Sequence, residues 1–305
     1  MATDTDAEGF LQGGASRTYE ELRGRLFEVI LLGATLIGIV SLAVLLGYVT
    51  VDALALFQPE GSWLNWELLT NSYSRFPEDA GIYPAIIGSL LVVGVMALLT
   101  FPVGVGAAIY LEEYTPNNRF TQLIQVNISN LAGVPSVVYG LLGLALFLKT
   151  LNMDRGLVIT AGVTLGLLIL PIVIVSAQEA LRSVPDSHRQ ASYGMGASRW
   201  QTIRNVVLPE ALPGILTGTI LALGRAIGET APLIMIGVAT TVFRPPTGLF
   251  EKATALPLQI FAWASFPQPE FRFGVVAASV VVLLGLMLLL NGTAILIRYR
   301  YERGK

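Results

Sequence analysis

Six long apolar stretches dominate this chain, and five of them contain no charged residue. In a helix, about 20 apolar residues at about 1.5 Å per residue cross the roughly 30 Å hydrocarbon core of a bilayer. A helix also satisfies its own backbone hydrogen bonds, as the hydrocarbon core demands. The pattern therefore predicts an all-α membrane protein with six transmembrane helices. The stretches lie within residues 29–51, 81–111, 120–148, 156–177, 211–243 and 273–297.

Composition and loop charge agree with a membrane location. Only 13% of the residues are charged and the mean hydropathy is +0.66, against about 25% charged residues in soluble domains. Twelve Lys and Arg residues flank the spans on the side that holds the termini, and six lie on the other side. Positively charged loops face the cytoplasm, so both termini are predicted to be cytoplasmic. The first span is too long for the core of a cleaved signal peptide.

The chain is expected to divide into two parts. Residues 1–80 comprise a cytoplasmic N-terminus, the first helix and an external loop, and residues 81–305 form a core of five helices. Within this core, Pro135 should separate a surface helix from the third span. Glu112 and Glu113, which follow the second span, are interpreted as a solvated turn at the membrane surface.

The fifth apolar stretch carries two charges, Arg225 and Glu229, and each costs about 2.5–3.5 kcal/mol at a bilayer centre. Residues four apart share a helix face, but Arg ahead of Glu is the weaker order for stabilising a helix. Gly214 and Gly218 fall on the same face and are expected to leave space beside the pair. Pro232 should kink or break the helix just past the pair, and broken helices in transporters line cavities. The pair is interpreted as lining the path of a charged ligand, and the alternative is a static ion pair that locks two spans together.

The connection between the fourth and fifth spans, at about residues 179–210, is patterned as an elbow of two short helices. A helix start at residues 184–187 is followed by a glycine turn and a second amphipathic segment. Such an elbow is expected to dock into a groove of another protein, and a helix pair lying on the membrane surface is the alternative. The side chains expected on its exposed face are Tyr193, Met195, Trp200 and Ile203, beside Arg189, Arg199 and Arg204.

The elbow resembles the coupling motif of the permease subunits of ATP-binding-cassette (ABC) importers. That motif reads Glu-Ala-Ala, three residues, Gly, nine residues, Ile, one residue and Leu-Pro. The matching residues are Gln190, Ala191, Ser192, Gly196, Val206, Leu208 and Pro209. Gln replaces Glu and Ser replaces the second Ala, while the glycine and Leu-Pro carry the shape of the elbow. The resemblance implies the ABC type I importer permease fold, with these residues coupling the chain to an ATPase.

Four further segments narrow this resemblance to the A-type permease subunits (PstA) of phosphate importers. Together they cover roughly residues 81–305. Phosphate has several acceptor oxygens, and a planar guanidinium can bind two of them at once. If the ligand is phosphate, Arg225 is predicted to contact it, Glu229 to neutralise the arginine in the empty path and prevent trapping, and Thr230 to offer a hydroxyl. The segments are residues 224–233, 133–141, 109–114 and 255–260.

The resemblance also implies partners and a location. It places the chain in the cell membrane, in contact with lipid, beside a second permease subunit (PstC-like). Two copies of an ATP-binding subunit (PstB-like) and an extracytoplasmic phosphate-binding protein (PstS-like) complete the complex, which moves inorganic phosphate by alternating access. The chain contains no Gly-x-x-x-x-Gly-Lys-Ser/Thr loop and only three lysines. ATP hydrolysis is therefore assigned to a partner, and the chain itself is not expected to be an enzyme.

Other functions stay open at this point. A permease for another oxyanion fits the same residues, and an ion-coupled secondary transporter or channel is a third candidate. An intramembrane enzyme is disfavoured because the chain lacks paired aspartates, a Ser/His arrangement and a metal cluster. Cysteine is absent and histidine occurs once, so neither a metal nor a cofactor is expected, and nucleic acid is not an expected partner.

Overall fold

A computed structural model describes residues 5–54 and 61–303, with side chains described for residues 22–54 and 61–300. The chain divides into two compact units, Met1–Val51 and Asp52–Lys305. The predicted division at residue 80 stays a prediction.

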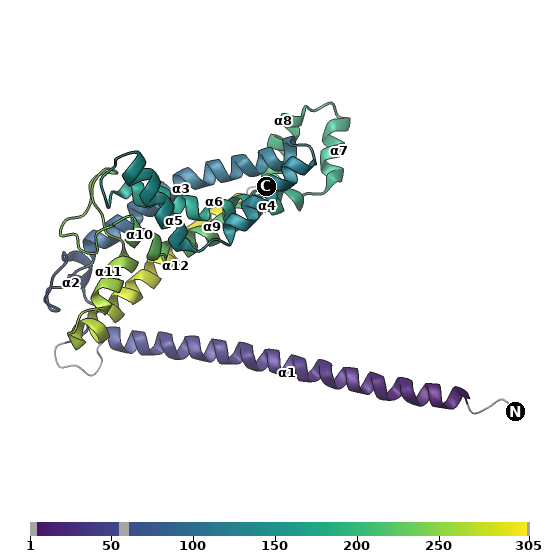
Figure 1. Cartoon of the computed structure of the whole chain (residues 1–305), viewed down its shortest axis with the longest axis horizontal. Helices are drawn as coiled ribbons and strands as arrows, with labels where there is room; N and C mark the ends of the chain where they lie inside the picture. Colours follow the sequence, from purple (N-terminus) through teal and green to yellow (C-terminus); the bar gives the residue numbers. More distant parts are fainter. Residues whose placement is uncertain (1–4, 55–60, 304–305) are drawn as a thin grey trace. The chain divides into compact units, whose positions relative to one another are not determined.

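The described part of the first unit lies within a single long helix, α1 (Thr5–Leu54), drawn in purple in Figure 1. Between Leu22 and Leu54 this helix is long and apolar enough to cross a membrane. Large apolar side chains are exposed along that length. A helix that is apolar on all sides is suited to lipid surroundings.

The regular secondary structure in the described residues of the second unit is helical, apart from an isolated β-bridge between Leu157 and Lys252, and turns and loops connect the helices. Several helices continue into short π-helical turns, labelled η. The elements in chain order are α2 (Trp66–Thr70), α3 (Tyr83–Ile109), η1 (Tyr110–Tyr114), α4 (Arg119–Ala132), α5 (Ser136–Gly143), η2 (Leu144–Thr150), α6 (Val158–Arg182), α7 (Asp186–Gly194), α8 (Arg199–Thr202), η3 (Ile203–Val207), α9 (Leu208–Ile227), α10 (Ala231–Met235), α11 (Leu256–Ala264), η4 (Phe271–Val275) and α12 (Val276–Arg303).

The predicted all-helical membrane fold is confirmed. In the described part of the chain, five helical segments are each long and apolar enough to cross a membrane. Helix α4 and the segment of α5 and η2, which meet at an angle of 102°, pass the same test only together, as a broken span or a re-entrant loop. The bend falls where the sequence predicts it, because Pro135 immediately precedes α5. The other segments are Leu22–Leu54, Tyr83–Tyr114, Val158–Arg182, Arg199–Ile227 and Phe271–Arg300.

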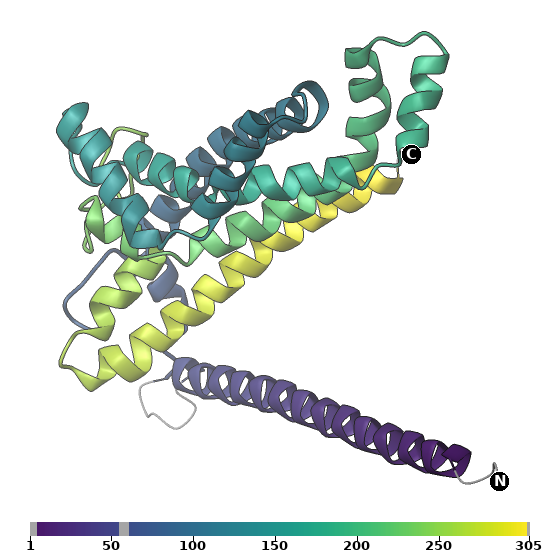
Figure 2. The ribbon, with the colours of Figure 1, turned by 45° about the vertical axis from the view of Figure 1, so that its right-hand side comes forward.

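Helix α6 is central to the second unit and packs against both α3 and α9. Small residues allow the close approach of α9. A side chain at Gly214 would lie 2.9 Å from the Cβ atom of Ala180, and one at Gly218 would lie 2.5 Å from Ser176. The prediction that these glycines leave space beside the charged pair is therefore wrong, because α6 fills it. Figure 2 shows α6, α9 and α12 running alongside one another, with α7 and α8 beyond the end of α6.

Candidate functional site

The charged pair lies at a break in the backbone. Helix α9 ends two residues after Arg225, so Glu229 lies outside it. The N–H of Gly228 donates to the carbonyl of Arg225 at 3.3 Å, and the N–H of Glu229 donates to that of Ala226 at 3.2 Å. These bonds span three residues instead of four, which tightens and closes the helix. Pro232 then lies in the first turn of α10, where its missing N–H is tolerated.

Two details of the fifth span therefore differ from the prediction. The break falls between Arg225 and Glu229, whereas it was expected after both. Pro232 also does not kink an existing helix, because it lies in the first turn of α10, which begins at Ala231. Arg225 consequently lies in the last turn of its span.

The contact between the two charges is loose. Arg225 Nε lies 4.0 Å from Glu229 Oε1, which is an ion contact and too long for a hydrogen bond. The side chain of Arg225 is 57% exposed and that of Glu229 is 20% exposed, while Thr230 is half-buried. A pair within one segment does not tie two spans of this chain together. The geometry favours a guanidinium open to a ligand over a static lock.

Neighbouring helices fix the backbone around the break. Helix α10 packs against α5 so closely that a side chain at Gly140 would lie 2.7 Å from the Cβ atom of Met235. On the side of α12, Asn291 lies 3.3 Å from where a side chain on Gly224 would begin. The backbone beside Arg225 is thus held in place while its guanidinium stays accessible.

Helices α7 and α8 form the predicted elbow, and they are joined by a turn at Gly196 with a φ of +83°. Glycine adopts this conformation without strain. Ser198 Oγ accepts a bond from the N–H of Gln201 at 3.4 Å, and the Gln201 side chain accepts one from the N–H of Ser198 at 2.8 Å. The hydroxyls of Ser192 and Thr202 lie 2.9 Å apart and link the two helices. These bonds fix the angle of the elbow.

The residues of the coupling motif occupy distinct parts of the elbow. Gln190 and Ala191 are exposed on α7, whereas Ser192 is buried. Leu208 and Pro209 form the first turn of α9, where proline is tolerated. The first two motif residues are therefore available to a partner, and the others shape the elbow.

The exposed face of the elbow is partly as predicted. Tyr193, Met195 and Trp200 are exposed, with Met195 reaching 82%. Ile203 is 0% exposed, so its predicted exposure is wrong: it begins η3 and faces the interior. Arg189 was also expected on the exposed face, but its side chain is only 14% exposed.

Arg189 joins three elements through one guanidinium. Its Nη2 donates to Glu113 Oε1 at 2.8 Å and to the carbonyl of Leu181 at 2.9 Å, and its Nη1 donates to the carbonyl of Val184 at 2.6 Å. Glu113 is only 5% exposed. Burial by itself would lower the pKa of Arg189, but the hydrogen bond to Glu113 and nearby negative charges raise it. The elbow is thereby attached to the end of α6 and to η1, which continues α3.

The interpretation of Glu112 and Glu113 as a solvated turn is wrong. Besides the pair with Glu113, Arg182 Nε donates to both carboxylate oxygens of Glu112, at 2.8 and 2.9 Å. Each acid lies 70 or more positions from its arginine, so no local pattern reveals the pairing. The available signal was that two acids after the second span and two arginines after the fourth belong to the same predicted membrane face.

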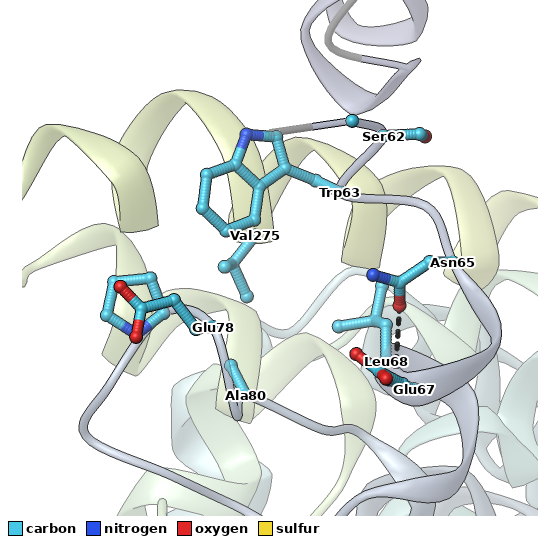
Figure 3. A pocket seen from close by; sticks show the side chains of 10 residues that line it. Ser62, Trp63, Asn65, Glu67, Leu68, Glu78, Ala80 and Val275 are labelled. Atoms are coloured by element: carbon cyan, nitrogen blue, oxygen red, sulfur yellow. Dashed lines mark hydrogen bonds between the residues drawn. The ribbon is translucent and has the colours of Figure 1, made fainter. Parts of the chain in front are cut away.

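A hollow of about 180 Å³ lies at the other end of the second unit from the elbow, between residues 61–80 and η4 (Figures 1 and 3). Asn65 Oδ1 accepts a bond from the N–H of Leu68 at 2.8 Å and so caps α2. The carboxylates of Glu67 and Glu78 line this hollow. Because both are negatively charged, the hollow is a poor site for an anionic ligand.

Comparison with known families identifies the chain. The family described as "Binding-protein-dependent transport system inner membrane component" matches residues 100–301, which include the elbow and the charged break. The chain belongs to this family. Membership confirms a multi-pass membrane protein that is a transport component and not an enzyme. It also confirms that the chain works as part of a multi-subunit system.

Curated relatives extend this result. The phosphate transport system permease protein PstA 1 of Mycobacterium tuberculosis (strain H37Rv) is 35% identical over 221 residues, which cover 72% of this chain and 70% of that protein. The probable ABC transporter permease protein YqgI of Bacillus subtilis is 34% identical over 200 residues, covering 66% of this chain and 68% of that protein. The phosphate transport system permease protein PstC of Haemophilus influenzae is 28% identical and covers 85% of this chain and 89% of its own length.

Solved structures confirm the predicted importer permease fold. A bacterial ABC transporter that imports the polysaccharide alginate aligns with a TM-score of 0.60 at 17% identity, covering 93% of this chain and 99% of that chain. The inward-facing MetNI methionine ABC transporter aligns with a TM-score of 0.59 at 19% identity, covering 72% of this chain and 97% of that chain. At these identities the likeness concerns the fold alone.

Proposed function

We propose that this chain is the A-type permease subunit of an ATP-driven importer of inorganic phosphate and forms half of the path through the membrane. One observation carries the proposal: the Arg225 side chain is 57% exposed at the end of a broken span, and its Nε lies 4.0 Å from a carboxylate that does not hydrogen-bond to it. Relatives named for phosphate transport, one of them 35% identical, support the choice of anion.

The chemistry of the break suits transient binding of phosphate. Arginine is always charged, and its planar guanidinium donates to two oxygens at once. Thr230 supplies a hydroxyl beside it. Glu229, whose Oε1 is 4.0 Å away, competes with phosphate for the same cation. This competition neutralises Arg225 in the empty path and keeps phosphate from being trapped.

Partners and orientation complete the proposal. A second permease subunit (PstC-like) forms the other half of the path, two copies of a PstB-like ATP-binding subunit lie at the cytoplasmic side, and a PstS-like phosphate-binding protein delivers the substrate. The chain lies in the cell membrane, with both termini on the cytoplasmic side. Exposed Met195 and Trp200 give the elbow an apolar face for the ATPase.

The elbow then transmits the closure of the ATPase subunits to the spans. It is connected to α6 and η1 through Arg189, and to α9 through η3. Movement of the elbow therefore acts on three elements together and switches the path between inward and outward access. Such switching is a rigid-body movement around a central binding site.

The complex reconstituted in lipid vesicles tests this function. Phosphate, delivered by its binding protein, should stimulate ATP hydrolysis and enter the vesicles only when ATP is supplied. Stimulation by sulfate and not by phosphate would indicate a permease for another oxyanion. Uptake that persists with a hydrolysis-deficient ATPase subunit would indicate an ion-coupled secondary transporter, and either result would contradict the proposal.

A further inference from the structure

Three cationic side chains line a second hollow, which has a volume of about 440 Å³. Lys149 comes from the last turn of η2, Arg155 from the connection between η2 and α6, and Lys252 from the connection before α11. All three are exposed. Among the residues that the structure describes, no ion pair or hydrogen bond engages these three side chains. The other lining residues are Leu144, Leu148, Met153 and Asp154.

The two connections are bonded into one scaffold although they lie almost a hundred positions apart. The N–H of Val158 donates to the carbonyl of Glu251 at 3.0 Å, and the N–H of Ala253 donates to the carbonyl of Gly156 at 2.9 Å. These bonds flank an isolated β-bridge that pairs Lys252 with Leu157, two residues after Arg155. The backbone that carries Arg155 and Lys252 is therefore held together, unlike that of lysines scattered over a surface.

The lining of the hollow has a net positive charge. Glu251 is adjacent to Lys252 but does not line the hollow, and its carboxylate accepts bonds from the N–H and the hydroxyl of Thr247 at 2.8 and 2.7 Å. Of the lining residues, Asp154 alone is acidic. Three cations and one carboxylate leave two positive charges, which match a dianion, and a concave surface concentrates their field.

The hollow lies close to the charged break and far from the elbow. The stem of Arg155 packs on Gly237, where an added side chain would begin 3.3 Å from the arginine Cδ atom. Gly237 follows the five-residue helix α10, about 7.5 Å long, and α10 itself begins just after Thr230. Helix α6 separates the hollow from the elbow by 25 residues, or about 37 Å.

We propose that this basic hollow receives phosphate, as the free dianion, on the extracytoplasmic side before the ion reaches Arg225. The inference rests on the proposed function, which places the elbow in the cytoplasm and the hollow on the opposite side. A concave site lined by cations from η2 and two loops suits a small oxyanion. An acidic side chain of the binding protein is the competing occupant and is distinguished by the test below.

The three lysines of the chain allow a direct test. The purified complex is treated with an amine-acylating reagent in phosphate or in chloride of equal ionic strength, and labelling of Lys149, Lys252 and Lys305 is quantified by mass spectrometry. Phosphate is expected to reduce labelling of Lys149 and Lys252 at least about threefold and to leave Lys305 unchanged. Equal labelling in both salts would overturn the proposal, as would protection by the binding protein without phosphate.

Variants separate this proposal from the function on which it rests. Arg155→Gln should abolish the protection and raise the half-saturating phosphate concentration for uptake by about tenfold, with little change in the maximal rate. Arg75→Gln removes another exposed arginine outside the hollow and should change neither quantity. If phosphate is imported but does not protect Lys149 and Lys252 from labelling, the proposed site in the hollow is contradicted and the proposed function is not. If phosphate protects these lysines but ATP does not drive its uptake, the proposed function is contradicted and the site in the hollow is not.

Discussion

Replacing Arg189 with glutamine is expected to be one of the most damaging single changes in the elbow. The side chain of Arg189 is 14% exposed and that of its partner Glu113 is 6% exposed. Glutamine removes the positive charge and leaves the Glu113 carboxylate buried without it. The carbonyls of Leu181 and Val184 also lose the donors that hold them at 2.9 and 2.6 Å.

The expected magnitude follows from burial. Breaking a buried ion pair by removing one partner costs about 3–5 kcal/mol, because an uncompensated charge stays buried. The neighbouring pair of Arg182 and Glu112 provides a matched control with the same 2.8 Å contact but with an arginine that is 52% exposed. An exposed pair contributes about 0–1 kcal/mol, so Arg182→Gln should be mild.

Thermal unfolding of the purified complex, in one detergent and at one heating rate, compares the variants. Arg189→Gln should lower the unfolding midpoint by about 10 °C, and Arg182→Gln by less than about 4 °C. The double variant Glu113→Gln/Arg189→Gln should lose less than the sum of its single changes, because the buried carboxylate has been neutralised. The same Arg189→Gln complex should hydrolyse more ATP per phosphate imported, because the elbow is no longer fastened to η1.

Two outcomes would refute this reasoning. Equal shifts for Arg189→Gln and Arg182→Gln would show that burial does not distinguish the pairs. Additive shifts in the double variant would show that Glu113 and Arg189 are not coupled energetically.

Further predictions concern the elbow and the charged break. Gly196→Ala should lower the free energy of unfolding by about 1–2 kcal/mol, because the φ of Gly196 is +83°, although no atom crowds the added Cβ. Gly194→Ala is the control, because Gly194 is equally uncrowded and has no positive φ. Equal costs for the two variants would contradict the explanation. Trp200→Ala should leave the unfolding midpoint unchanged but reduce the amount of ATPase subunit that co-purifies with the chain by about tenfold or more. Full co-purification would exclude Trp200 from that interface. Glu229→Gln should lower the maximal uptake rate by about tenfold without raising the half-saturating phosphate concentration, and a raised concentration would contradict its role in release.

Much of the fold follows from local pattern. The apolar stretches predict the spans because a membrane helix satisfies its own backbone bonds. Pro135 marks the 102° bend between α4 and α5, and Gly196 marks the turn of the elbow. Each of these features depends on residues that are neighbours in the sequence, so a single sequence contains the necessary information.

Most errors arise where distant segments meet. Glu113 is buried because Arg189, 76 positions away, packs against it. Gly214 was expected to leave open space beside the charged pair, but α6 fills that space. The basic hollow was missed for the same reason, since its cations come from η2 and two separate loops. One error is local: Pro232 was expected to break a helix but lies in the first turn of α10, because the preceding turn has already closed α9.

The claim that Arg225 carries phosphate is tested most directly by ATP-driven uptake of radioactive phosphate in vesicles containing the complex with Arg225→Gln. Uptake should fall at least about a hundredfold while every subunit still assembles, and Arg75→Gln should transport normally. Uptake near the wild-type rate, or failure of the Arg225→Gln complex to assemble, would contradict the claim.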